Sequence, residues 1–172
     1  LLGTYLERAD NTARILDARF EFLAPEAAKS RDAGSSFFTA DDVKSAAKGK
    51  RRLAVLFLDF DGFKEINDQF GHDMGDLLLV EVAKRLRDVI GDRGSVARLG
   101  GDEFAIVLED VSSDTNVHAI AEKMLRSISS PLTLSEQQVS VDASIGGAIY
   151  PEDGPEFSGL VDCARSAMQQ AK

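Results

Sequence analysis

The sequence predicts an α+β domain in which a mixed sheet of four or five strands is flanked by helices, with one extra helix at the amino terminus. Three observations support this fold class. Residues 53–60 form an unbroken apolar run, two apolar segments around residues 96–108 flank a Gly-Gly turn, and segments with helical periodicity separate these strands. The predicted order is helix, strand, helix, strand hairpin, helix, strands and a final helix, which is the layout of a ferredoxin-like core.

The composition describes one soluble globular domain with an acidic surface. Its 172 residues suit a domain of ordinary size plus one extra helical element, and 44% of them are hydrophobic while 28% are charged. A net charge of -9 argues against nucleic acid or an anionic membrane surface as a partner. A polyanionic ligand must therefore be met by local cations or by a metal ion.

Cysteine usage and hydropathy indicate a cytoplasmic protein. Cys163 is the single cysteine, which excludes an intrachain disulfide and fits a reducing compartment. No apolar run approaches the roughly 18 residues that would span a bilayer, so we expect no membrane segment in this chain. Because the sequence starts without Met and stops at Lys172, we expect it to be part of a longer protein.

Residues 1–36 are predicted to be a helix followed by a linker. Apolar side chains recur in alternating steps of four and three from Leu2 to Leu23, which is typical of a helix with one narrow seam. The seam could pack on its own domain or join two chains in a parallel helical pair. A proline ends the helix, and residues 30–36 have the serines and glycine of a linker. Around residues 5–14 the chain is similar to a segment of the bacterial alpha-E family, which brings no catalytic motif.

The remaining residues, 37–172, are predicted to form the main domain. It opens with a helix over residues 38–48 and a central strand over residues 53–60, because an apolar run without alternation is typical of a strand covered on both faces. Asp59 interrupts this run at its carboxyl end. In layered folds of this kind, ligands collect at that end of the strands.

A helical region follows Asp59. A short helical turn through Ile66 leads into a predicted loop over residues 71–75, which contains two glycines, and then into a helix over residues 76–90. The Gly-Gly hairpin comes next, and its second strand covers residues 104–108.

Three more elements complete the domain. Apolar residues with a period of about 3.6 predict a helix over residues 117–128, which Pro131 stops. Residues 139–150 alternate loosely and predict further strand structure. Residues 160–171 predict a final amphipathic helix.

The Gly-Gly turn is the predicted active site. Asp102 and Glu103 follow the two glycines and stand directly against an apolar strand, where a desolvated carboxylate is costly unless a cation or donor compensates it. If the strand that ends at Asp59 is a neighbour of this hairpin, three carboxylates converge on one edge of the sheet. Three hard oxygen ligands suit Mg²⁺ or Mn²⁺.

Residues 100–104 read Gly-Gly-Asp-Glu-Phe, and further segments fall in a matching order and spacing. They are Leu58-Asp59-Phe60-Asp61-Gly62-Phe63-Lys64 with Ile66-Asn67-Asp68, Gly71-His72 with Gly75-Asp76, Ser144-Ile145-Gly146, and Pro151-Glu152-Asp153-Gly154. From residue 53 to the end, the chain therefore resembles the GGDEF domain, the diguanylate cyclase family. The resemblance implies a palm-type variant of the ferredoxin-like fold and an enzyme that condenses two GTP into cyclic di-GMP and two pyrophosphates.

The resemblance also implies a role for each matching residue. Asp59, the backbone carbonyl of Phe60 and Asp102 would bind Mg²⁺ or Mn²⁺. Glu103 would be a further metal ligand or would assist deprotonation of the attacking 3′-hydroxyl, and Asp102 is the other candidate base. The positions implied to bind substrate are Lys64, Asn67, His72, Asp76, Gly100, Gly101 and Lys172.

Among these positions, Asn67 and Asp76 would read guanine. Guanine presents an acceptor at O6 and donors at N1 and N2, so an amide paired with a carboxylate recognises it, whereas adenine offers the opposite pattern. An adenylyl-type cyclase or polymerase-like palm enzyme is therefore disfavoured. Lys172 falls on a family lysine that contacts phosphates. Because a protomer that binds one GTP cannot make both phosphodiester bonds, the expected partners are GTP and a second copy of the chain in a homodimer.

Several departures from the family pattern leave a second function open. The opening Asp-x-Leu-Thr-Gly-Leu-x-Asn-Arg segment is absent, and a family arginine beyond Lys172 lies past the end of the chain. Arg165 and Gln169 replace the usual Asp and Tyr of the last helix. Gly91 and Gly94 stand where an inhibitory Arg-x-x-Asp motif would lie, so we expect no product inhibition through that site. The alternative is a catalytically inactive GGDEF module that binds GTP or dimerises as a regulatory element.

Overall fold

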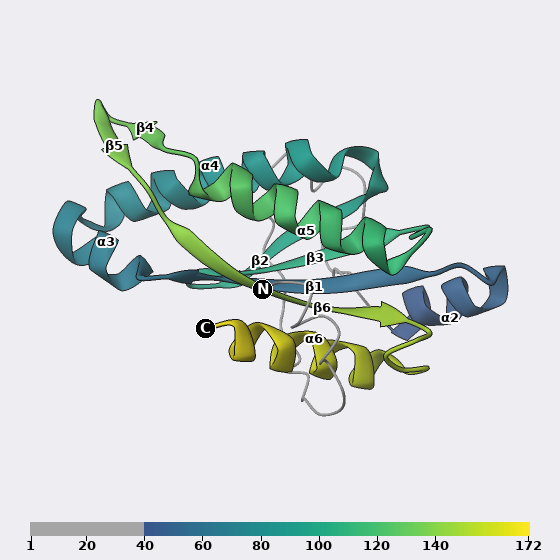
Figure 1. Ribbon diagram of the computed structural model, residues 1–172. Helices are drawn as coiled ribbons and strands as arrows, with labels where there is room; N and C mark the ends of the chain where they lie inside the picture. Colours follow the sequence, from purple (N-terminus) through teal and green to yellow (C-terminus); the bar gives the residue numbers. More distant parts are fainter. Residues whose placement is uncertain (1–39) are drawn as a thin grey trace.

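The computed structural model describes residues 40–172. The predicted amino-terminal helix, its seam, the linker and the alpha-E similarity lie outside the described residues. The described chain forms a four-stranded sheet with helices on both faces (Figure 1). Its elements in order are α2 (Ala40–Gly49), β1 (Leu53–Asp61), α3 (Phe63–Phe70), α4 (His72–Ile90), the 3₁₀ turn η2 (Gly91–Arg93), β2 (Gly94–Gly100), β3 (Glu103–Glu109), α5 (Asp114–Ser129), β4 (Leu132–Leu134), β5 (Gln137–Val139), β6 (Asp142–Tyr150) and α6 (Phe157–Ala171). None of these helices is long and apolar enough to cross a membrane.

The sheet has the strand order β2-β3-β1-β6, and each neighbouring pair is antiparallel. The α+β class and a sheet of four strands are confirmed, whereas the pairing is antiparallel throughout rather than mixed. β1 and β2 run parallel to each other, but the hairpin inserts β3 between them. Parallel strands are therefore not neighbours in the described sheet.

β1 lies in the centre of the sheet and is covered on both faces, as its unbroken apolar run predicts. Leu56 and Leu58 belong to a core that contains residues of α4 and α5, while Val55 and Phe57 belong to a second core with residues of α2 and α6. Figure 1 shows these two helical layers on opposite faces of the sheet. Side chains alternate along a strand, so Asp59 continues the series of Val55 and Phe57 and lies on the α6 face.

The close approach of α6 to β6 depends on Gly146. A Cβ at this position would lie 2.5 Å from the carbonyl oxygen of Ala164 and would also collide with the backbone nitrogen of Met168. Only glycine allows helix and strand to approach this closely. As a result α6 runs directly along the sheet, and its carboxyl end lies toward the end at which β1 leads into α3 (Figure 1).

The helix α4 begins at His72, so the prediction of a loop over residues 71–75 is wrong. Gly71, with a φ of 86°, is the single residue between α3 and α4. Two glycines make the segment resemble a loop in the sequence. In the fold, however, Met74 and Gly75 are buried residues of the first helical turn, and Gly75 packs against the side chain of Asn67 in α3.

The β4–β5 hairpin is absent from the sequence prediction. Its turn residues Ser135 and Glu136 have φ of 46° and 68°, and its residues Leu132 and Val139 are buried in the core beneath α4 and α5. The strand predicted from residue 139 therefore begins only at Asp142, as β6. Strands of three residues are too short to show an alternating pattern in the sequence.

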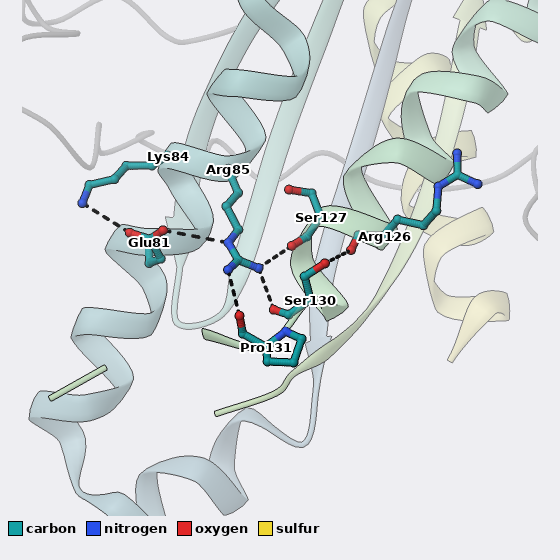
Figure 2. Close-up of polar contacts among 7 residues, drawn as sticks. All are labelled: Glu81, Lys84, Arg85, Arg126, Ser127, Ser130 and Pro131. Carbon is teal, nitrogen blue, oxygen red and sulfur yellow. Dashed lines mark hydrogen bonds and ion pairs between the residues drawn. The ribbon is translucent and has the colours of Figure 1, made fainter. Parts of the chain in front are cut away.

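Arg85 of α4 holds the carboxyl end of α5, as Figure 2 shows. Its guanidinium donates to the carbonyl oxygens of Ser127, Ser130 and Pro131, with distances of 2.7 Å to Ser130 and 3.2 Å to Pro131. Glu81, one turn earlier in α4, lies 3.9 Å from the same side chain. These bonds satisfy carbonyl groups that the end of a helix leaves without partners. They join the two helices that cover one face of the sheet.

Candidate active site

The predicted hairpin turn between β2 and β3 is confirmed. Gly100 and Gly101 have φ of 151° and 56°, values that side chains of L residues rarely tolerate. The register shifts between Arg98 and Gly100, and the Nε of Arg98 donates to the carbonyl oxygen of Gly101 at 2.8 Å. The turn is thus held in a defined shape, and Asp102 follows it immediately before β3 begins.

Asp59 and Glu103 lie directly opposite each other in the β1–β3 pair. Ala105 and Val107 of β3 belong to the core that α6 covers, so alternation puts Glu103 on the same face as Asp59. Asp102 lies in the turn directly before Glu103, and repulsion from Asp59 raises the pKa of its carboxyl group. The predicted neighbouring strands and the convergence of their carboxylates on one edge are therefore observed.

Two cations, Arg165 in the middle of α6 and Lys172 directly after it, face these carboxylates. The Nζ of Lys172 lies 2.6 Å from Oδ2 of Asp59, and the Nη2 of Arg165 lies 3.1 Å from Oε2 of Glu103. The sequence prediction assigns Arg165 no role in the site. Its spacing of two helical turns before Lys172 is the signal that puts both side chains on one face of the helix.

Burial makes negative charge costly in this site. Desolvation raises the pKa of Asp102, and repulsion from Asp59 raises it further. Desolvation also raises the pKa of Glu103, while the charge of Arg165 opposes that shift. The hydrogen bond with Asp59 raises the pKa of Lys172, so this ammonium group is charged at neutral pH.

The site has the donor chemistry of a magnesium or manganese site. The Oδ1 of Asp59 is buried, and it has no hydrogen-bond partner within the part of the chain that the structure describes. A divalent cation would satisfy this oxygen and compensate carboxylates whose charge is costly here. The ring of Phe60 packs in the core on the face of the sheet opposite to the carboxylates. The backbone carbonyl of Phe60 is therefore the group that it could contribute to a metal ion.

The two α6 cations stand in the way of such a metal ion. As the side chains lie, no group of three His, Cys, Asp or Glu residues within residues 40–172 is arranged to hold a metal. Lys172 and Arg165 instead pair with Asp59 and Glu103. A divalent cation would therefore have to displace these two cations or share the carboxylate oxygens with them.

Four of the predicted substrate-binding residues lie on α3 and in the first two turns of α4. Asn67 of α3 is half-buried, and its Oδ1 takes the space that a Cβ at Gly75 would need. His72 and Asp76 are exposed in the first two turns of α4, and Lys64 is exposed in the first turn of α3. Because α3 follows β1 directly, α3 and the start of α4 lie at the end of the sheet at which β1 ends with Asp59 and Asp61 (Figure 1).

The segment between α4 and β2 does not supply an Arg-x-x-Asp pair. At Gly94, the position of the aspartate, a side chain would collide with the carbonyl oxygen of Val107 in β3. The adjacent Arg93 donates to the carbonyl oxygens of Val89 at 2.7 Å and Ile90 at 3.1 Å. Its guanidinium is thus engaged with the carboxyl end of α4.

Comparison with known proteins points to one family. The family model described as "Diguanylate cyclase, GGDEF domain" matches residues 37–172. Over 130 residues the chain is 45% identical to the bifunctional diguanylate cyclase/cyclic di-GMP phosphodiesterase MucR of Pseudomonas aeruginosa, a match that covers 76% of this chain and 19% of that protein. Over 120 residues it is 42% identical to the cyclic di-GMP phosphodiesterase NbdA of the same organism, covering 70% of this chain and 15% of NbdA. The chain thus spans less than a fifth of the length of these two curated relatives.

A solved structure shows the same fold. The GGDEF domain of TpbB (YfiN) from Pseudomonas aeruginosa superimposes with a TM-score of 0.74 at 41% sequence identity, covering 77% of this chain and 78% of that one. Sequence and fold therefore agree. The chain belongs to the GGDEF domain family of diguanylate cyclases.

Proposed function

We propose that this domain is a diguanylate cyclase that condenses two GTP molecules into cyclic di-GMP. In each half-reaction the 3′-hydroxyl of one GTP forms a bond to the α-phosphorus of the other, and the bond to the pyrophosphate leaving group breaks. The observation that carries the proposal is the convergence of Asp59, Asp102 and Glu103 on one edge of the sheet, with a buried carboxylate oxygen that has no protein partner among the described residues.

Asp59, Asp102, Glu103 and the backbone carbonyl of Phe60 would hold Mg²⁺ or Mn²⁺. The metal would neutralise negative charge on the triphosphate and on the leaving pyrophosphate. Asp102 and Glu103 are also the two candidate bases for the 3′-hydroxyl. Desolvation raises the pKa of both carboxyl groups, which makes each a better proton acceptor than an exposed carboxylate.

The remaining residues of the proposed site bind and orient GTP. The amide of Asn67 and the carboxylate of Asp76 pair with the guanine edge, and His72 lies beside the nucleotide. Lys64 and Lys172 bind the phosphates. For this, Lys172 has to break its ion pair with Asp59. The open backbone at Gly100 and Gly101 lets the triphosphate approach the turn closely, because no atom lies within 4 Å of a Cβ at either position.

Catalysis would take place in a homodimer. The proposed residues bind one GTP in each protomer, whereas the product contains two new phosphodiester bonds. Two half-sites must therefore face each other across a two-fold axis. A GTP substrate and a single, buried cysteine favour a cytoplasmic setting for this reaction.

A second candidate function is a GGDEF module that binds GTP or dimerises without turnover. The ion pairs of Lys172 with Asp59 and of Arg165 with Glu103 support it, because they neutralise two carboxylates that the cyclase reaction needs free. One relative of this chain is named as a phosphodiesterase alone.

Incubation of the protein with GTP and Mg²⁺, followed by chromatography, distinguishes the two candidates. A cyclase forms cyclic di-GMP and pyrophosphate from GTP, forms no cyclic product from ATP, and loses the activity in the Asp102→Asn variant. GTP binding by calorimetry without any cyclic di-GMP would favour the regulatory module. Equal turnover of ATP would contradict the proposed guanine recognition by Asn67 and Asp76.

A further inference from the structure

Arg165 is a charged residue of the site to which the proposed mechanism gives no part. It lies on α6, and its Nη2 is 3.1 Å from Oε2 of Glu103. Both side chains are largely buried, with 21% and 22% of their surface exposed. A pair this far from solvent is screened much less than a surface ion pair.

A second contact fixes the guanidinium in this place. Its central carbon lies 4.8 Å from the centroid of the Phe57 ring, and Phe57 is one of the buried residues of the core beneath α6. The Nε of Arg165 is buried and has no hydrogen-bond partner within residues 40–172. The guanidinium is therefore held by the Phe57 ring and by Glu103, while its Nε–H has no acceptor among the described residues.

The charges of the site nearly cancel when both α6 cations are in place. Three carboxylates, from Asp59, Asp102 and Glu103, face the two positive charges of Arg165 and Lys172, which leaves one net negative charge. Desolvation is the largest influence on the charged form of Glu103, and the charge of Arg165 opposes it. Without Arg165, the Glu103 carboxylate would stay in the same desolvated position and lose this compensating cation.

We propose that Arg165 is a positioning residue that holds Glu103 in the metal-free site and competes with the divalent cation for it. The proposal rests on the proposed function for the existence of the metal site. A metal ion bound to a Glu103 oxygen would stand within a few ångströms of the guanidinium, and like charges at that separation repel strongly in a partly buried site. Arg165 thus stabilises the domain without metal and weakens its affinity for metal.

The variant Arg165→Met tests both effects, because the methionine side chain still covers Phe57 but carries no charge. Electron paramagnetic resonance of Mn²⁺ titrated with the protein, in the absence of nucleotide, measures the affinity for Mn²⁺ directly. We expect Mn²⁺ to bind about tenfold more tightly to the variant than to the natural chain. Thermal melting should show a lower midpoint than the natural chain in EDTA and a larger rise on adding Mn²⁺.

Three further variants sharpen the test. Arg165→Gln also removes the charge and should bind Mn²⁺ more tightly, which keeps the test valid if the methionine variant does not fold. Arg165→Lys keeps the charge and should bind Mn²⁺ as the natural chain does. Arg126→Met is the matched control. Arg126 lies in an exposed pair with Glu122 at 3.5 Å on α5, which covers the face of the sheet opposite to α6, and its loss should leave Mn²⁺ affinity unchanged.

Unchanged or weaker Mn²⁺ affinity in both uncharged variants would overturn the proposal, as would a failure of Mn²⁺ to bind any of the proteins. Failure of the proposed function is a separate result. A natural chain that makes no cyclic di-GMP, with Mn²⁺ affinity still raised in Arg165→Met, refutes the cyclase and leaves this inference standing. Cyclic di-GMP formation with no change in affinity refutes only the inference.

Discussion

Replacing Gly75 by alanine should impair GTP recognition while leaving the fold intact. Gly75 lies in the first turn of α4, where a Cβ would stand 2.0 Å from Oδ1 of Asn67 and 3.2 Å from the ring of Phe63. Alanine in a helix interior normally stabilises by about 1 kcal/mol relative to glycine. Here the added methyl group meets the end of a flexible side chain, so the cheapest response is a shift of the Asn67 amide and not of the backbone.

The size of the effect follows from that shift. To reach the 3.4 Å of an ordinary contact from 2.0 Å, the amide oxygen must move by about 1.4 Å. A displacement of this size breaks a hydrogen bond to guanine, which costs roughly 1–3 kcal/mol when the other partner stays buried. We therefore expect kcat/KM for GTP to fall roughly five- to 150-fold, mainly through KM.

Steady-state kinetics with GTP measure this change, and calorimetric titration with a non-reactive GTP analogue measures the binding part alone. Gly159→Ala is the matched control, because Gly159 also lies in a helix and no atom stands within 4 Å of its added Cβ. It should leave KM unchanged. A Gly75→Ala protein with natural melting temperature and natural KM would refute the assignment of Asn67 to the guanine site.

Four further predictions follow from the same structure. Asp59→Asn and Asp102→Asn should each lower kcat by about two orders of magnitude or more with an unchanged circular dichroism spectrum, and natural activity in either would contradict the site. Specific activity should rise with protein concentration below the dimer dissociation constant, whereas full activity of a sample shown by ultracentrifugation to be monomeric would disprove the shared site. Progress curves should not slow as micromolar cyclic di-GMP accumulates; tight calorimetric binding of cyclic di-GMP that Arg93→Ala abolishes would show that the region around η2 does bind product. Arg85→Met should lower the free energy of unfolding in urea by roughly 1.5–3 kcal/mol, because carbonyl groups at the end of α5 lose a charged donor, while the exposed Lys84→Met should change it by less than about 0.5 kcal/mol.

The sequence by itself determined the order of the main elements, and it predicted the residues of the proposed site. An apolar run without alternation identifies β1 as a central strand, because only a strand covered on both faces needs apolar residues at every position. The two glycines before Asp102 identify a turn, because few other residues adopt the backbone conformation that it requires. These are local signals, and each is complete within a short stretch of chain.

Two local predictions failed because packing overrode the local pattern. Gly71 and Gly75 suggest a loop, yet Gly75 is helical, and the side chain of Asn67 from α3 occupies the space that its Cβ would need. The β4–β5 hairpin forms from strands of three residues, and what stabilises it is the burial of Leu132 and Val139 in the core. In both cases the stabilising contact joins segments that are apart in the chain, so the local sequence of either segment does not predict it.

Only the tertiary structure decided which charges meet in the site. Asp59 and Glu103 share a face because β1 and β3 pair in one register, and a slip of one residue would turn one of them to the opposite core. Arg165 reaches Glu103 because Gly146 lets α6 lie close against the sheet. The pairing of these side chains depends on register and helix approach together, which are set by the packing of segments far apart in the chain.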